Sequence, residues 1–201
     1  MDNTFQFLLN NNTQLNLNKI KAKDFYWLFI NGSPRCHTGP MKWSRSLSVS
    51  DNDWQTIFKS LKTICKENKL KEFHFKFIHR IIVTKKELHR FGIKDDDECL
   101  YCGDPDSIDH SFFHCHFTKV FIANVIQWFN NSNNSHFSPS IEETLLGMLS
   151  SQHGKKVTRK FNYTLLFMRY YIYSRKLHSQ AITLEGFKDD ITLKYQIESF
   201  S

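Results

Sequence analysis

The 201-residue sequence is poor in glycine and proline and has no long uninterrupted apolar run. It holds only 7 Gly and 4 Pro, too few for the many tight turns of a β-sandwich or a propeller. Neither G-x-G-x-x-G nor G-x-x-x-x-G-K-[ST] occurs, which argues against a dinucleotide-binding fold or a phosphate-binding loop. No stretch of about 20 apolar residues is present, so the sequence predicts no membrane span.

The first residues also lack the features of a signal peptide. Position 2 is Asp, and only a short apolar patch follows, whereas a signal peptide has a basic start, a longer apolar run and a small-residue cleavage site. We therefore expect an intracellular protein, nuclear or cytoplasmic, with no membrane partner. Three of the 5 Cys fall between positions 99 and 115, close to histidines. In such a compartment, this clustering favours a metal site over disulfides.

The residues that are abundant point to a folded, basic chain. Hydrophobic residues make up 40% and aromatic residues 15%, with 19 Phe, which is enough apolar surface for a core and argues against a wholly disordered chain. There are 27 Lys+Arg against 20 Asp+Glu, giving a formal net charge of +7. A basic balance of this kind favours polyanionic partners.

Apolar residues recur at helical spacing, and we predict an all-α fold. Trp54, Ile57, Phe58, Leu61 and Ile64 fall on one helical face. Residues 31–50 look irregular. Further helices are expected over residues 70–82, 117–129 and 161–177, in a weakly helical tail over 183–201, and after capping boxes at Thr84–Glu87 and Ser140–Glu143.

The sharpest motif is a set of metal-ligand residues in the middle of the chain. Cys99, Cys102, His110 and Cys115 have the spacing C-x2-C-x7-H-x4-C. Three thiolates and one imidazole suit tetrahedral zinc, and four protein ligands leave no open position for water. We therefore predict a structural Zn²⁺ site, a CCHC zinc knuckle. His114 could replace Cys115 as a ligand, and His116 is also near. Cys36 and Cys65 are expected to be structural.

Catalytic interpretations of these residues are weaker. A zinc deaminase needs H-x-E followed by P-C-x-x-C, and neither occurs. The residues Asp109-His110 after a Cys pair have a faint likeness to a zinc nuclease, but the second Cys pair usual there is missing. H-E-x-x-H and G-x-S-x-G are also missing. We expect no small-molecule substrate.

Basic residues flank the predicted zinc ligands on both sides, and their stripes can attract phosphates. Aromatic residues such as those at 170–173 fit core packing better than base stacking. The candidate nucleic-acid-binding residues are Lys76, Arg80, Lys85, Lys86, Arg90, Lys155, Lys156, Arg159 and Lys160.

These residues also resemble a known family. The run Phe73-His-Phe-Lys-Phe-Ile-His-Arg-Ile-Ile-Val-Thr-Lys-Lys-Glu-Leu88, followed by Cys99-x2-Cys102-x7-His110-x4-Cys115, resembles the zinc-binding region at the carboxyl end of reverse transcriptases from non-LTR (long interspersed element) retrotransposons. Lys85 stands where the family often has Asn. The resemblance extends more weakly over most of residues 22–190, including Tyr171-Ile-Tyr-Ser-Arg-Lys176.

The resemblance implies a nucleic-acid-binding segment that follows a polymerase domain and helps to engage RNA and DNA in target-primed reverse transcription. It implies no catalysis in this chain, because 201 residues cannot also hold the polymerase fingers and palm, and no endonuclease is recognisable. The partners implied are RNA, DNA or both, and the polymerase domain of the same element. The alternative is a truncated or domesticated relic that acts as a protein-interaction module.

We predict three regions from these patterns. Residues 1–50 form an N-terminal linker and partly irregular segment. Residues 51–130 form the helical zinc-binding domain, with the knuckle in its middle, and residues 131–201 form a C-terminal helical extension.

Overall fold

The computed structural model describes residues 38–147 and 154–200. Its described part is helical and contains no strand, which confirms the all-α prediction, although an isolated bridge joins Glu98 to Pro105. The predictions for residues 1–37, including the structural role of Cys36, concern a segment outside the described residues. The helices are α2 (Thr38–Trp43), α3 (Asp51–Thr63), α4 (Asn68–Ile78), α5 (Lys85–Arg90), η2 (His110–His114), α6 (His116–Asn133), α7 (Ile141–Leu146), α8 (Lys155–Leu177) and α9 (Leu184–Phe200).

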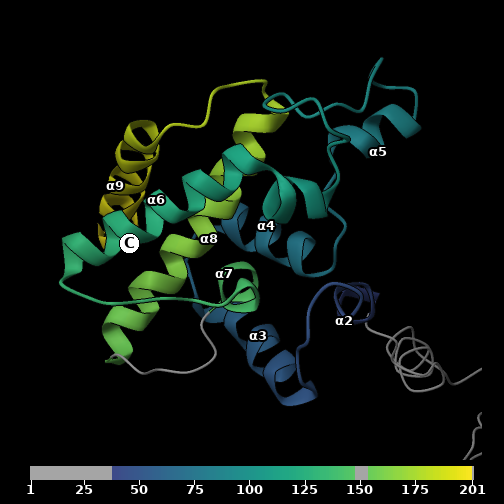
Figure 1. Ribbon diagram of the computed structural model, residues 1–201. Coiled ribbons are helices and arrows are strands. Elements are labelled where there is room, and N and C mark those ends of the chain that lie inside the picture. The colour runs from purple at the N-terminus through teal and green to yellow at the C-terminus, as the bar shows by residue number, and fades with distance from the viewer. Residues whose placement is uncertain (1–37, 148–153, 201) are drawn as a thin grey trace, which may run out of the picture.

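Helix α8 is the central element of the fold. It contacts α4, α6, α7, α9 and the one-turn η2, and Figure 1 shows it crossing the middle of the molecule. Its side chains are buried on nearly every side, because helices cover most of its circumference; Phe161, Leu165, Leu166, Met168 and Ile172 are almost inaccessible to solvent. A helix buried all round needs apolar residues beyond one stripe, and the run over 161–172 supplies them.

Local capping chemistry sets the starts of three helices. Ser50 accepts a hydrogen bond from the Asp53 N–H at the start of α3. Full capping boxes open α5, with Thr84 and Glu87, and α7, with Ser140 and Glu143. These two boxes confirm the predicted helix starts, since each pairs two backbone donors that the first helical turn leaves unsatisfied.

Tertiary contacts explain where the structure departs from the predicted boundaries. Helix α2 lies in the segment expected to be irregular, and its Trp43 Nε1–H donates to the Ile78 carbonyl at 2.9 Å. A Cβ on Gly39 would lie 2.5 Å from that same oxygen, so only glycine permits this close approach. Helix α4 ends at Ile78 instead of near residue 82, and Arg80 adopts a left-handed backbone (φ 51).

The C-terminal region follows the prediction more closely. Helix α8 begins at Lys155, six residues before the predicted start, and α9 forms from the weakly helical tail. Phe187 of α9 is fully buried against Phe121, Phe167 and Tyr171. This ring cluster anchors α9 across α6 and α8, so the extension packs onto the same core as the zinc-bearing segment.

Candidate metal centre

A tight turn positions the first two metal-ligand residues. The Gly103 N–H donates to the Cys99 carbonyl at 2.9 Å, and the Cys99 N–H donates to the Asp104 carbonyl at 2.6 Å. Gly103 has φ 82, in the left-handed region that glycine tolerates best. Gly103 therefore permits the tight turn, and Cys99 and Cys102 converge on one side of it.

A π-helical turn positions the other two. His110 begins η2, and Cys115, five residues later, follows its end. The Cys115 N–H donates to the His110 carbonyl at 2.9 Å. The Ser107 hydroxyl accepts a hydrogen bond from the His110 N–H at 3.1 Å. A turn closed by this hydrogen bond between residues i and i+5 brings both side chains to the same face. Such π-helical turns are frequent at functional sites.

The structure brings the four predicted ligands together. The Cys102–Cys115 and Cys99–Cys115 Sγ–Sγ distances are 3.9 and 4.0 Å, Nε2 of His110 lies 3.1 Å from Cys102 Sγ, and all four donor atoms lie within 4.8 Å of one another. Two sulfurs on a tetrahedral zinc with bonds of about 2.3 Å are about 3.8 Å apart, whereas a disulfide bond is about 2.05 Å. The spacing thus suits a cation between free thiols.

Electrostatics suit metal binding at His110 and Cys115, whereas burial raises the pKa of the Cys102 thiol to about 12. Burial lowers the pKa of His110, with the Lys176 charge adding to the effect, so the imidazole is neutral, as a ligand must be. Burial opposes ionisation of Cys115, but the Thr118 N–H and the Lys176 charge outweigh it and lower the pKa of the thiol. Cys115 is also the N-cap of α6, where a thiolate is favoured.

The alternative histidines stay outside this cluster. His114 and His116 are exposed, and their rings lie against the neighbouring Phe113 and Phe117. Neither belongs to the donor group that the described residues form. Cys65 is buried in the core, away from the cluster, as expected for a structural cysteine.

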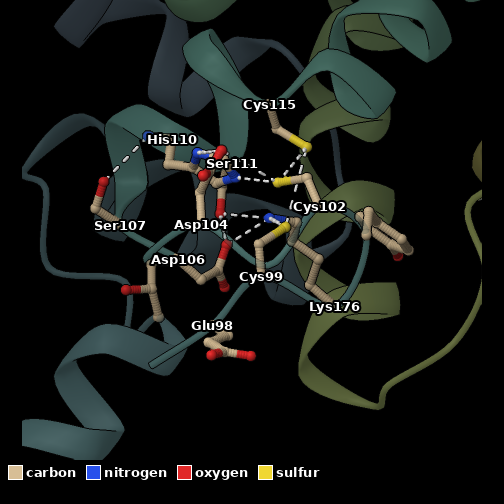
Figure 2. Close-up of polar contacts among 12 residues, drawn as sticks. Glu98, Cys99, Cys102, Asp104, Asp106, Ser107, His110, Ser111, Cys115 and Lys176 are labelled. Atoms are coloured by element: carbon tan, nitrogen blue, oxygen red, sulfur yellow. Dashed lines mark hydrogen bonds and ion pairs between the residues drawn. The ribbon is translucent and has the colours of Figure 1, made fainter. Parts of the chain in front are cut away.

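A buried ion pair from a distant helix lies against the cluster (Figure 2). Lys176 of α8 places its Nζ 3.2 Å from Cys99 Sγ and 2.9 Å from Ser111 Oγ, and it forms an ion pair with Asp106. Only 7% of the Lys176 side chain and 8% of the Asp106 side chain are exposed. This role of Lys176 has no signal in the sequence, because no spacing rule relates a lysine to a cysteine 77 residues away.

We expect Lys176→Met to weaken zinc binding by about 10- to 100-fold, the usual effect of losing an outer-shell partner. The ammonium donates to a ligand sulfur, and its loss also leaves Asp106 as a buried carboxylate without its cation. Competition against a chelating dye measures the affinity. Arg175→Met is the matched control, because Arg175 lies one residue earlier and pairs with Asp190 instead. Equal affinity in both variants would contradict this role.

The predicted basic residues before the zinc ligands are largely paired with acids. Lys76 lies 2.6 Å from Glu72, and Lys85 pairs with Asp96. Arg80 makes two hydrogen bonds to Asp109, at 2.8 and 2.6 Å, and lies over the Trp43 ring. These cations are therefore partly neutralised. Two other predicted cations, Lys86 and Arg90 of α5, are exposed.

The predicted basic residues of α8 are exposed over its first two turns. Lys160 donates to the Asn133 side chain at 2.7 Å, and Arg159 donates to the Thr63 carbonyl at 3.4 Å. With Lys155 and Lys156, they make a cationic helix start. Nothing acidic occurs in the first turn of α8, so these charges are not offset on their own helix.

A Phe-x-Asp-Asp sequence occurs at Phe187-Lys-Asp-Asp190, which matches by letters the motif that holds the catalytic acids of reverse transcriptases. It lies on α9, where Phe187 is part of the core and Asp190 is paired with Arg175 at 2.9 Å. The match is therefore part of a packed helix and not an active-site turn.

The fold and the donor cluster define a helical protein with a Cys₃His site compatible with structural zinc. Residues 42–121 match the model of a family described as zinc-binding in reverse transcriptase, so over that segment the resemblance to a reverse-transcriptase zinc-binding region is confirmed. The match contains all four donors but ends before Lys176. No curated protein matches the chain, and no solved structure does. Within the described residues, no helix has the length and apolar character needed to cross a membrane.

Proposed function

We propose that this chain is a zinc-stabilised, nucleic-acid-binding segment of a retrotransposon reverse transcriptase. The observation that carries the proposal is the Cys₃His cluster inside a segment that matches the reverse-transcriptase zinc-binding family. In this role the metal is structural: four protein donors hold it and leave no position for a reacting water. The chain would engage RNA or DNA beside a polymerase domain, without a polymerase or endonuclease site of its own.

The charge distribution supports a polyanionic partner. The chain carries a net charge of +7, and the start of α8 presents four basic residues with no acid in its first turn. Lys and Arg side chains that contact phosphates release condensed counterions, which favours binding at low salt. A neutral or basic partner would gain nothing comparable from this surface.

We expect the zinc-loaded chain to bind labelled RNA and DNA with an affinity that falls as salt rises. With about four phosphate contacts, the plot of log affinity against log salt for duplex DNA should have a slope of about −3 to −4. Fluorescence anisotropy over a series of salt concentrations measures it, and the chelator-treated chain is the control. A flat plot would contradict phosphate binding.

The alternative role, a relic that binds another protein, has one observation in its favour. Apolar side chains are exposed after α5 and in the knuckle turn, with Phe91 61%, Ile93 65% and Leu100 52% accessible. Such a surface suits a protein partner, including the polymerase domain of the same element. The salt series separates the two roles, because an apolar interface keeps its affinity at high salt.

A further inference from the structure

An open groove lies where the corner between α3 and α4 meets the first turns of α8. It has a volume of about 570 Å³, and its walls come from segments about 90 residues apart in the sequence. Arg159 of α8 links the two walls through its hydrogen bond to the Thr63 carbonyl. The residues that line it are Ser60, Thr63, Ile64, Cys65, Lys66, Lys71, Lys155, Thr158, Arg159 and Asn162.

The groove is cationic. Lys66, Lys71, Lys155 and Arg159 contribute four positive charges, and no carboxylate is found among the described residues that line it. Lys71, Lys155 and Arg159 form no ion pair with any residue that the structure describes.

The basic residues that precede the zinc ligands in the sequence differ from the groove because carboxylates lie beside them. Acids offset their charge, because Lys85 pairs with Asp96 and Arg80 pairs with Asp109. The segment over 94–109 that follows α5 holds seven acids and one base. A polyanion that approaches the molecule is therefore repelled by the knuckle side and attracted to the groove.

We propose that this groove binds the phosphodiester backbone of a nucleic acid and is the principal nucleic-acid contact of the chain. The inference rests on the proposed function and deepens it, because it selects one surface and adds Lys66 and Lys71 to the residues that the sequence indicated. The groove is open to solvent, so a polymer can lie along it. Backbone contacts of this kind position a nucleic acid without reading its sequence.

The test compares two triple variants of the zinc-loaded full chain that remove the same charge. The groove variant is Lys71→Gln, Lys155→Gln and Arg159→Gln. The control is Lys85→Gln, Lys86→Gln and Arg90→Gln on α5. Binding of labelled duplex DNA and single-stranded RNA is measured by anisotropy against salt. We expect the groove variant to reduce the magnitude of the DNA salt slope by about 3, since each lost phosphate contact removes about 1, and the control to leave it nearly unchanged.

Each other result overturns the inference in a distinguishable way. A native chain with no salt-dependent binding removes the proposed function and this inference together. A native chain that binds while both triples lose affinity equally, or while only the control loses it, retains the proposed function but not the groove. Displacement of DNA by poly-glutamate as efficient as by unlabelled DNA would assign the groove to an acidic protein. If the groove triple does not fold, the single variants Lys71→Gln and Lys155→Gln should each reduce the slope by about 1, and no change in either overturns the inference.

Discussion

Removal of the metal, or the substitution Cys102→Ser, is expected to unfold the middle of the chain and to lower its melting temperature by about 20 °C or more. Structural zinc contributes on the order of 10 kcal/mol, which is comparable with the whole stability of a domain. The segment over 94–109 has little apolar burial to replace it, since Ile108 is its only buried hydrophobic residue besides Cys99. Circular dichroism melting with and without chelator measures the effect.

Unfolding of the knuckle should spread beyond it. Cys115 caps α6, Asp109 holds Arg80, and Lys176 ties α8 to Cys99, so three neighbouring elements lose contacts when the cluster opens. His114→Ala is the matched control, because His114 is exposed and lies beside the ligands without joining them; it should keep the native melting temperature and its sensitivity to chelator. Unchanged melting of the native chain after chelation would contradict a structural metal.

The parts of the fold that depend on neighbours in sequence were predictable. Capping boxes need residues only three positions apart, and both of those predicted are present at Thr84 and Ser140. The spacing of the four metal-ligand residues is likewise local, within one turn and one helix start. Helical periodicity located α3, α4, α6 and α8, with an error of a turn or more at one end of α4, α6 and α8.

The predicted helix boundaries are wrong where contacts between residues distant in the sequence determine the structure. The sequence around Gly39 indicates a loop, yet α2 forms because Trp43 docks on the end of α4 through the Ile78 carbonyl. The α4 pattern continues to Ile81, but the left-handed turn at Arg80 leaves Ile81 49% exposed. The formation of α2 does not follow from local propensity, since it depends on a segment 35 residues away.

Local sequence patterns also do not reveal which charged side chains pair with one another. The sequence gives the number of cations but not which of them lie beside acids. Arg80, for example, pairs with Asp109, which is 29 positions later. The sequence also cannot show that Lys176 reaches Cys99 or that Lys71 shares a groove with Lys155. Residue type and spacing were enough to predict the four donors that the structure brings together; their surroundings depend on the packing of α8.

The second large effect concerns Arg169, a charged residue in the most buried helix. Its side chain is fully buried, its three guanidinium nitrogens have no hydrogen-bond partner among the described residues, and it lies 5.3 Å from the Phe77 ring. Burial of an unpaired charge is costly, and replacement of buried ions by apolar residues of similar volume often stabilises a protein. We expect Arg169→Met to raise the free energy of unfolding by about 1 to 4 kcal/mol, measured by urea denaturation.

Arg175→Met is the control, since Arg175 is on the same helix but more exposed and paired with Asp190; it should be neutral or slightly destabilising. The pH dependence gives an independent check. Burial lowers the pKa of Arg169 to about 9, below its value in the unfolded chain, so between the two pKa values the unfolded state binds the extra proton and native stability rises with pH. The advantage of Arg169→Met should therefore be constant from pH 7 to 8 and shrink above pH 9. A destabilised Arg169→Met variant would instead show that the guanidinium contributes favourably to the fold.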